Sequence, residues 1–264
     1  SPRSGTLRLL DERPGLPRFG LPDELVRLYG GPLGFDEPCV YTNFVETLDG
    51  VVAIPELDRS NALVAGESEA DRFVMGLLRA LADVVLVGAG TLLASPKGTW
   101  RPDRVYPAAA GAFAELRQSR GRGERPAVAI VTSGASLDPE HPLLADAVVL
   151  TTARGAAALA GVAPDVVAVN DGDWVDLRAA IDVLHGRGHS LVLSEGGPTL
   201  FGGLLAQACV DELFLTLSPV LAGRDGTERL ALIEGVELLP EATAAAELLS
   251  ARRDGDHLFL RYRL

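Results

Sequence analysis

Residues suited to binding an anion and a second ligand follow one predicted strand in the second half of the chain. Residues 189–193 form an apolar run of strand length, and Ser194-Glu195-Gly196-Gly197-Pro198-Thr199 comes next. A helix is predicted to begin there, with Leu200 on its apolar face. Free N–H groups at a helix start suit phosphate, and two glycines allow backbone conformations that a Cβ forbids. Glu195 is a poor neighbour for an anion, so we expect it to face another ligand, as in a cofactor-dependent enzyme.

A second glycine turn, Gly88-Ala89-Gly90-Thr91, follows the apolar strand predicted at 84–87. It resembles the start of a dinucleotide-binding fingerprint, but the third glycine position holds Leu93, so the Rossmann signal is weak. The turn nevertheless offers a ligand a glycine-lined approach.

Two further polar residues follow predicted strands. Asp49 ends the strand 40–48 and precedes Gly50, so it is either a turn former or a reacting group. Ser133 follows the strand 126–131. Because ligands of parallel sheets lie beyond the carboxyl ends of the strands, we expect these residues and the two glycine turns to gather at one edge.

The strands and helices that must position these residues alternate along the chain. Apolar runs also predict strands at 147–151, 166–169 and 213–217, and helical periodicity predicts helices at 67–81, 113–118, 174–185 and from Pro198. This alternation predicts an α/β fold with a mostly parallel central sheet and helices on both faces. Strands at 244–252 and 257–264, joined by Asp254-Gly255-Asp256, predict an antiparallel hairpin at the C-terminal edge.

Composition limits the classes of function. With 264 residues, 47% of them apolar, the chain can bury a large core. Its formal net charge of −12 argues against nucleic acid or an anionic membrane as the main partner. Only Cys39 and Cys209 are present, which predicts neither a disulfide framework nor a zinc site and favours the cytoplasm. No metal site is expected, and no apolar run is long enough to span a membrane.

Residues 1–37, rich in Pro and Gly, are predicted to be an N-terminal extension with a short helix at Asp23–Tyr29. Residues 38–264 are predicted to form a single domain. The most basic loop carries Lys97, Arg101 and Arg104, which form either a solvated face or a site for an anionic ligand.

Six motifs, taken together, resemble a known family. In chain order they are Thr47-Leu48-Asp49-Gly50, Leu78-Arg79-Ala80 with Asp83, Val87-Gly88-Ala89-Gly90-Thr91, Glu195-Gly196-Gly197-Pro198-Thr199-Leu200, Asp211-Glu212-Leu213, and Ser218-Pro219-Val220-Leu221-Ala222-Gly223. The chain from about Cys39 onward looks like the reductase domain of riboflavin biosynthesis, which shares the dihydrofolate-reductase fold.

The resemblance implies reduction, with NADPH, of a ribosylamino-pyrimidine phosphate to its ribitylamino form. It implies substrate contacts by Ser60, Arg79, Arg101 and Glu195. The implied cofactor contacts are Gly88, Gly90, Thr91, Ser133, Gly196, Gly197, Thr199 and Leu200. Asp49 is expected to orient the reacting end or to transfer a proton. Reductases of this family are usually homodimers, so a homodimer is expected.

The chain departs from the bifunctional bacterial enzymes of this family. Ser95-Pro96 stands where they carry acidic residues, and no zinc-deaminase signature is present. Asn43 stands where they tend to have lysine near the pyrimidine ring. Asn43 is either a core amide without a ligand or a contact to the ring, since an asparagine offers an acceptor as well as donors. We therefore expect the ring that still carries its amino group to be accepted at least as well as the deaminated uracil form. Two alternatives stay open: reduction of a dihydrofolate-like pterin on the same fold, and a nucleotide-binding module without turnover.

Overall fold

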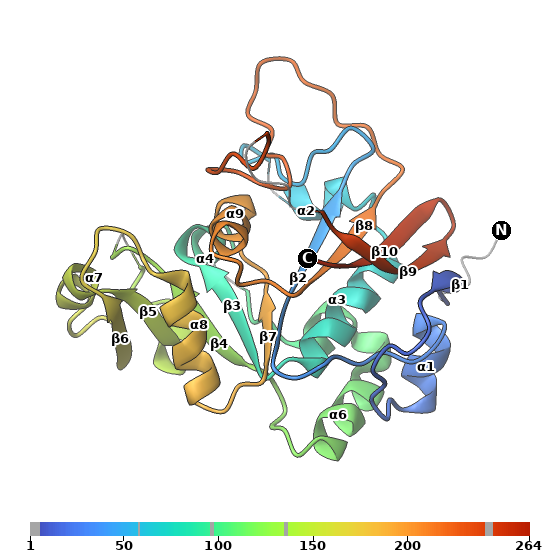
Figure 1. Ribbon diagram of the computed structural model, residues 1–264, viewed down its shortest axis with the longest axis horizontal. Helices are drawn as coiled ribbons and strands as arrows, with labels where there is room; N and C mark the ends of the chain where they lie inside the picture. Colours follow the sequence, from blue (N-terminus) through green and yellow to red (C-terminus); the bar gives the residue numbers. More distant parts are fainter. Residues whose placement is uncertain (1–5, 58, 96–97, 135–136, 241–244) are drawn as a thin grey trace.

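The computed structural model describes residues 6–57, 59–95, 98–134, 137–240 and 245–264, and one twisted sheet runs through them (Figure 1). The strand order is β1-β9-β10-β8-β2-β7-β3-β4-β5-β6. All neighbours from β8 to β6 are parallel, and the pairs β8·β10, β10·β9 and β9·β1 are antiparallel. The strands are β1 Arg8–Glu12, β2 Cys39–Glu46, β3 Val84–Gly88, β4 Ala127–Val131, β5 Val148–Thr152, β6 Asp165–Asn170, β7 Leu191–Ser194, β8 Glu212–Leu217, β9 Glu247–Asp254 and β10 His257–Arg263.

Helices cover both faces of the sheet, as the sequence predicted (Figure 1). One core cluster joins α1, α3 and α6 to the sheet, and a second joins α8 and α9 to the opposite face. The helices are α1 Asp23–Tyr29, α2 Ser60–Val64, α3 Glu69–Leu81, α4 Ala89–Ala94, α5 Pro102–Val105, α6 Ala110–Ser119, α7 Ala153–Ala158, α8 Leu177–Gly186 and α9 Pro198–Ala206. The α/β class, the parallel centre and the antiparallel C-terminal strands are therefore confirmed.

Helix α3 is capped at its start and packs on the sheet along one side. Ser68 caps its start, because the Ser68 hydroxyl accepts a hydrogen bond from the N–H of Asp71 at 3.2 Å. An apolar stripe that includes Phe73 and Leu77 packs on the sheet. Since the helix leads through Ala82 and Asp83 directly into β3, its first turn must point to the edge where the parallel strands have their carboxyl ends.

The predicted position of the C-terminal hairpin at the sheet edge is wrong. Strands β9 and β10 pair with each other, but β9 also pairs with β1 from the N-terminus. The open edge is therefore β1, which the sequence did not predict because Leu9 and Leu10 are followed at once by acidic residues. Covering β9 with β1 satisfies backbone groups that an exposed edge would leave unpaired.

Residues 6–37 pack closely against the rest of the fold. The predicted helix at Asp23–Tyr29 is present, and Leu25, Leu33 and Phe35 are buried in the core cluster of α3. The segment 51–54, which follows Gly50, forms an isolated antiparallel bridge between Ala53 and Leu230.

Candidate active site

The two glycine turns lie side by side at the carboxyl ends of β3 and β7. These strands are parallel neighbours, and the N–H of Glu195 donates to Leu86 O at 3.0 Å. The N–H of Gly197 donates to Thr91 Oγ1 at 3.1 Å, which ties the start of α9 to α4. The predicted cofactor residues of both turns are therefore brought together.

The glycines of these turns are not needed for their backbone conformation, contrary to the sequence-based expectation. Gly88 and Gly197 are the residues before α4 and α9, with φ values of −86° and −70° that any residue adopts. The glycines instead leave space open beside the backbone, where a side chain would otherwise lie. A Cβ on Gly90 would meet no atom within 4 Å, and one on Gly197 would meet only Thr91 Oγ1, at 3.9 Å. Gly196 is different, because its Cβ would lie 2.4 Å from Leu200 Cδ2.

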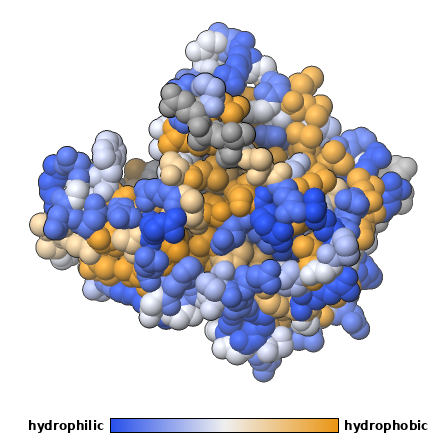
Figure 2. Space-filling view, in the orientation of Figure 1, coloured by the Kyte–Doolittle hydropathy of each residue, from blue (hydrophilic) through white to orange (hydrophobic). Residues whose placement is uncertain are grey.

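This bare backbone fits a dinucleotide cofactor. The first turn of α9 carries no acidic residue, so its N-terminus presents N–H groups without a competing negative charge. Thr199 is exposed in that turn, and Leu200 is half-buried beside Gly88. Figure 2 shows hydrophobic residues gathered across the middle of the face on which α9 lies.

Ser133 lies one strand farther along, exposed at the carboxyl end of β4, the neighbour of β3. The next residue, Gly134, has a φ of 98°, and a Cβ there would lie 2.7 Å from the Cα of Gly155. A glycine is thus required for the loops after β4 and β5 to approach each other. Arg154, at the start of α7, is exposed and pairs with Asp173 at 3.4 Å.

Asp49 links the loop after β2 to the loop after β8. Its carboxylate accepts hydrogen bonds from Thr47 Oγ1 at 2.6 Å and from the N–H groups of Ala222 and Gly223 at 3.0 and 2.8 Å. These bonds, the Thr47 hydroxyl first, hold the pKa of Asp49 far below its usual range. An exposed carboxylate that stays ionised suits positioning better than proton donation.

Arg79 and Glu195, both predicted to contact substrate, contact each other. Arg79 Nε lies 2.9 and 3.0 Å from the two Glu195 oxygens, and Arg79 Nη2 lies 2.6 Å from Oε2. The side chains are only 13% and 8% exposed. The geometry is the bidentate form of the arginine–carboxylate pair, so either residue must share or exchange this partner to bind a ligand.

Asn43 shares a face of the sheet with Glu195. The parallel register pairs Thr42 with Ser194, which places the next residues, Asn43 and Glu195, side by side at the strand ends. The buried Oδ1 of Asn43 has no hydrogen-bond partner within the described part of the chain. Since β2 ends at Glu46, Asp49 lies in the following turn, outside the regular alternation of the strand that contains Asn43.

The remaining predicted substrate residues are held by local contacts. Ser60 Oγ accepts from the N–H of Ile54 at 2.7 Å and so fixes the loop before α2. Arg101 precedes α5 and pairs with Asp103 through Nε at 3.0 Å and Nη2 at 3.3 Å. The predicted Lys97 and Pro96 lie outside the described residues.

The sequence analysis missed Asp71, a buried acid in the first turn of α3. It is 4% exposed, and its pKa is raised to about 6, mainly by burial and further by the charge of Glu195. A hydrogen bond from Thr216 and the charge of His257 act in the opposite direction. A usable signal was present, because Asp71 stands three residues before Val74 and seven before Leu78, on the apolar stripe of the helix.

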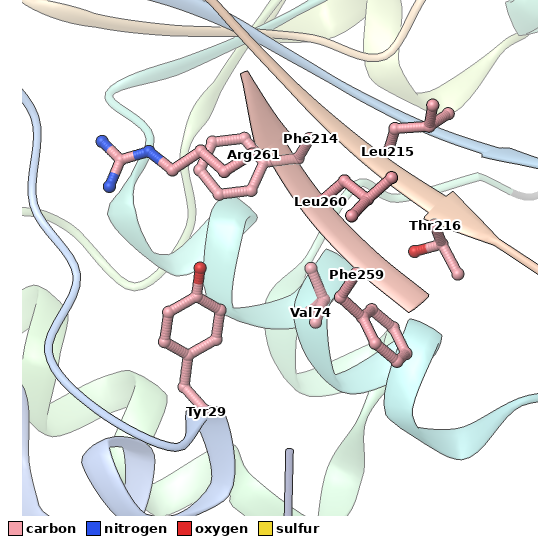
Figure 3. Close-up of a pocket in the computed structure, with 8 residues that line it drawn as sticks. All are labelled: Tyr29, Val74, Phe214, Leu215, Thr216, Phe259, Leu260 and Arg261. Atoms are coloured by element: carbon pink, nitrogen blue, oxygen red, sulfur yellow. The ribbon is translucent and has the colours of Figure 1, made fainter. Parts of the chain in front are cut away.

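A pocket lies between α3 and the antiparallel strands β8 and β10, away from the glycine turns (Figure 3). Tyr29, Phe214 and Arg261 line it. Thr216 also lines this pocket, and its side chain is hydrogen-bonded to Asp71. Arg261 is committed to Glu212, with Nε 2.6 Å from Oε2. This pocket therefore belongs to the packing of the core.

The described ranges contain neither a cluster of metal-ligating side chains nor a membrane-spanning helix. No group of three or more His, Cys, Asp or Glu residues there is arranged to hold a metal ion. No helix in the same ranges is long and apolar enough to cross a membrane.

Comparison with known proteins gives consistent matches. The family model described as the RibD C-terminal domain matches residues 38–259. Two relatives are named 2,5-diamino-6-ribosylamino-4(3H)-pyrimidinone 5′-phosphate reductase. The one from Archaeoglobus fulgidus is 30% identical over 200 residues, which cover 71% of this chain and 84% of the relative. The one from Methanothermobacter thermautotrophicus is 28% identical over 233 residues, covering 85% and 97%.

Solved structures show the same fold. A pyrimidine reductase-like protein from Corynebacterium diphtheriae has a TM-score of 0.67 at 21% identity, covering 92% of this chain and 95% of its own. RibD of Acinetobacter baumannii has a TM-score of 0.63 at 18% identity, covering 90% of this chain and 59% of its own. The match of the family model over most of the chain confirms the resemblance seen in the sequence: this chain belongs to the RibD C-terminal domain family, the pyrimidine reductases of riboflavin biosynthesis.

Proposed function

We propose that this protein is a reductase that converts a ribosylamino-pyrimidine 5′-phosphate to its ribitylamino form, with NADPH as the reductant. The proposal rests mainly on two unlike surfaces that lie next to each other at the ends of neighbouring strands. The bare glycine turns joined by Gly197 and Thr91 suit a dinucleotide, and the polar cluster of Asn43, Arg79 and Glu195 suits a polar ring and sugar. The names of the two relatives support the same reaction class.

The chemistry divides between cofactor and protein. A reduced nicotinamide supplies a hydride. The chain must bring the ribose C1′ to the place of hydride delivery and exclude water. Gly88, Gly90 and the start of α9 would hold the cofactor backbone. Asp49 would fix the loops after β2 and β8 at the reacting end through its bonds to Ala222 and Gly223.

The substrate is the 2-amino form of the ring, the diaminopyrimidinone, in preference to the deaminated uracil form. Asn43 Oδ1 is a buried acceptor without a partner in the described part of the chain. An unsatisfied buried acceptor costs about 1–3 kcal/mol, and an amino N–H of the ring would satisfy it. A ring carbonyl at that place would face it with a second acceptor.

Steady-state NADPH oxidation with each purified substrate tests the function. We expect turnover with the diaminopyrimidinone phosphate, a lower kcat/KM with the uracil form and none with dihydrofolate. Turnover of the pterin alone would replace this proposal by the pterin reductase, and cofactor binding without any turnover would replace it by a binding module.

The same proposal includes a homodimer and a cytoplasmic location. The open edge strand β1, with Leu9 and Leu10 exposed at 43% and 45%, is the surface that we expect a second copy to cover. Sedimentation at micromolar concentration measures the mass, and a monomer would contradict the dimer.

A further inference from the structure

Two buried carboxylates, Glu195 and Asp71, lie on the α3 side of the sheet near the strand ends, and they differ in how their charge is balanced. Glu195 has a bidentate arginine partner. Asp71 has no ion pair with any Arg, Lys or His of the described residues. The charged groups around it are Glu195 directly after β7, Arg72 on its own helix and His257 on β10. Arg72 pairs with Glu69, and His257 Nε2 contacts Ala65 O at 3.0 Å.

Asp71 lies close to the proposed ring site. Its hydrogen-bond partner Thr216 is on β8, directly beside Val45 of β2. Asn43 is two residues before Val45 and on the same face, about 7 Å away along the strand. Asn43 and Thr216, the hydrogen-bond partner of Asp71, therefore lie on the same face of two neighbouring strands.

A buried carboxylate without a counterion is costly. Burial accordingly raises the pKa of Asp71 to about 6, so the group is mostly ionised above that pH and lacks donors. A ligand with two adjacent N–H groups would stabilise the carboxylate by charge-assisted hydrogen bonds.

The 2-amino pyrimidinone ring has such an edge. Its N3–H and one N–H of its 2-amino group point the same way, and the second N–H of that amino group remains free for Asn43 Oδ1. We propose that Asp71 accepts hydrogen bonds from the N3–H and 2-amino edge of the substrate and thereby selects the 2-amino ring over the 2-oxo ring. The inference rests on the proposed function, because it names the group that would set its substrate.

The selection follows from the donors and acceptors. After deamination the ring presents N3–H beside a carbonyl oxygen, and that oxygen would face an acceptor-only carboxylate. Repulsion against the wrong ring is an effective source of specificity, and leaving a buried polar group unpaired costs more than removing a contact.

The test is Asp71→Asn, measured with both purified substrates. The amide keeps the shape and can still accept from Thr216, but it offers one acceptor and one donor, which match N3–H and the carbonyl of the uracil ring. We expect kcat/KM for the diaminopyrimidinone to fall about tenfold to a hundredfold, the range for a hydrogen bond to a charged group. We expect kcat/KM for the uracil form to stay or rise.

Glu69→Gln is the matched control, because Glu69 lies in the same turn of α3 but its side chain is 70% exposed. It should leave the substrate ratio unchanged. The urea unfolding midpoint and the NADPH dissociation constant report folding for both variants. Equal losses with the two substrates in Asp71→Asn would overturn the inference. A wild-type protein that turns over neither substrate would instead reject the proposed function.

A wild-type measurement keeps the inference testable if Asp71→Asn does not fold. The preference for the 2-amino substrate should decline as pH falls through about 6, because protonation removes an acceptor. Both substrates carry the same phosphate, so its titration cancels in the ratio. His257→Gln should retain the decline, which excludes His257 as its source. A preference that does not change with pH would overturn the inference.

Discussion

The two halves of the candidate active site are built in opposite ways. On the side of α4 and α9, glycines leave the backbone bare, and a Cβ on Gly90 or Gly197 would find open space. On the side of α3, buried charged groups fill the space, and Arg79 donates three hydrogen bonds to Glu195. The first surface is open to a ligand, whereas the second already contains a buried ion pair between two of its side chains.

The difference implies different costs of binding. A ligand on the glycine side can accept hydrogen bonds from the N–H groups in the first turn of α9. A ligand on the α3 side must replace or join contacts that the protein already makes, so its net affinity depends on matching donors and acceptors closely. We expect the glycine side to tolerate chemical variation in its ligand, and the α3 side to provide substrate specificity.

The largest expected effect is on stability and comes from breaking the buried pair. Glu195→Ala leaves Arg79 charged and buried without its partner, which should lower the free energy of unfolding by about 3–5 kcal/mol. Urea unfolding followed by circular dichroism measures it. The double variant Arg79→Leu with Glu195→Leu should regain most of the loss, since no unpaired charge remains. A double variant as unstable as Glu195→Ala would show that packing, not charge, causes the loss.

A smaller effect is expected at Arg101, whose guanidinium is shared with Asp103. Arg101→Ala should raise the substrate KM about tenfold to a hundredfold, equivalent to about 1.5–3 kcal/mol, through a lost phosphate contact. NADPH KM should change little. The matched variant Asp103→Asn frees the guanidinium and should lower the substrate KM. If Asp103→Asn raises that KM as much as Arg101→Ala does, the pair is structural.

On the glycine side, Gly197→Val should weaken NADPH binding by at least about tenfold, or about 1.4 kcal/mol. The φ of −70° suits valine, and the space is open, so the fold should be unaffected. Gly111→Val is the control, because a Cβ on Gly111 in α6 also meets no atom within 4 Å. Fluorescence titration with NADPH measures both. Equal affinity in the Gly197 variant and the wild type would remove the glycine turns from the cofactor site.

The same contrast explains what could be predicted from the sequence. Apolar runs and helical periods placed β3, β4, β7 and α9, because the core residues of a parallel sheet are local signals. The glycine turns were located correctly for the same reason. The sequence did not reveal that these glycines leave open space beside an ordinary backbone, because that depends on atoms distant in the chain.

Contacts between residues that are far apart in the sequence could not be predicted. Arg79 and Glu195 are 116 positions apart, so the sequence marked each as polar but not the pair as mutually satisfied. Asp71 was passed over because an acid beside a serine cap is ordinary in a first helical turn. Strand β1 was missed because its role is to cover β9, which is more than 200 residues away in the chain.

The smallest expected effect concerns Asp49, which joins the loops after β2 and β8. The variant tests whether Asp49 positions these loops or transfers a proton. Its pKa is held far below the usual value by Thr47 and by the N–H groups of Ala222 and Gly223, so it does not titrate near neutral pH. Asp49→Asn should lower kcat by less than about tenfold, the range expected for the loss of one ordinary hydrogen bond. The shape of the kcat profile between about pH 5 and 8 should not change.

Because the folded pKa is lowered, the contribution of Asp49 to stability is present above its unfolded pKa of about 3.9 and is lost as pH falls toward the folded value. The difference in Tm between the wild type and Asp49→Asn should therefore be largest near pH 7 and should decrease below about pH 4. Loss of a limb of the kcat profile in Asp49→Asn would instead identify Asp49 as a proton-transfer group.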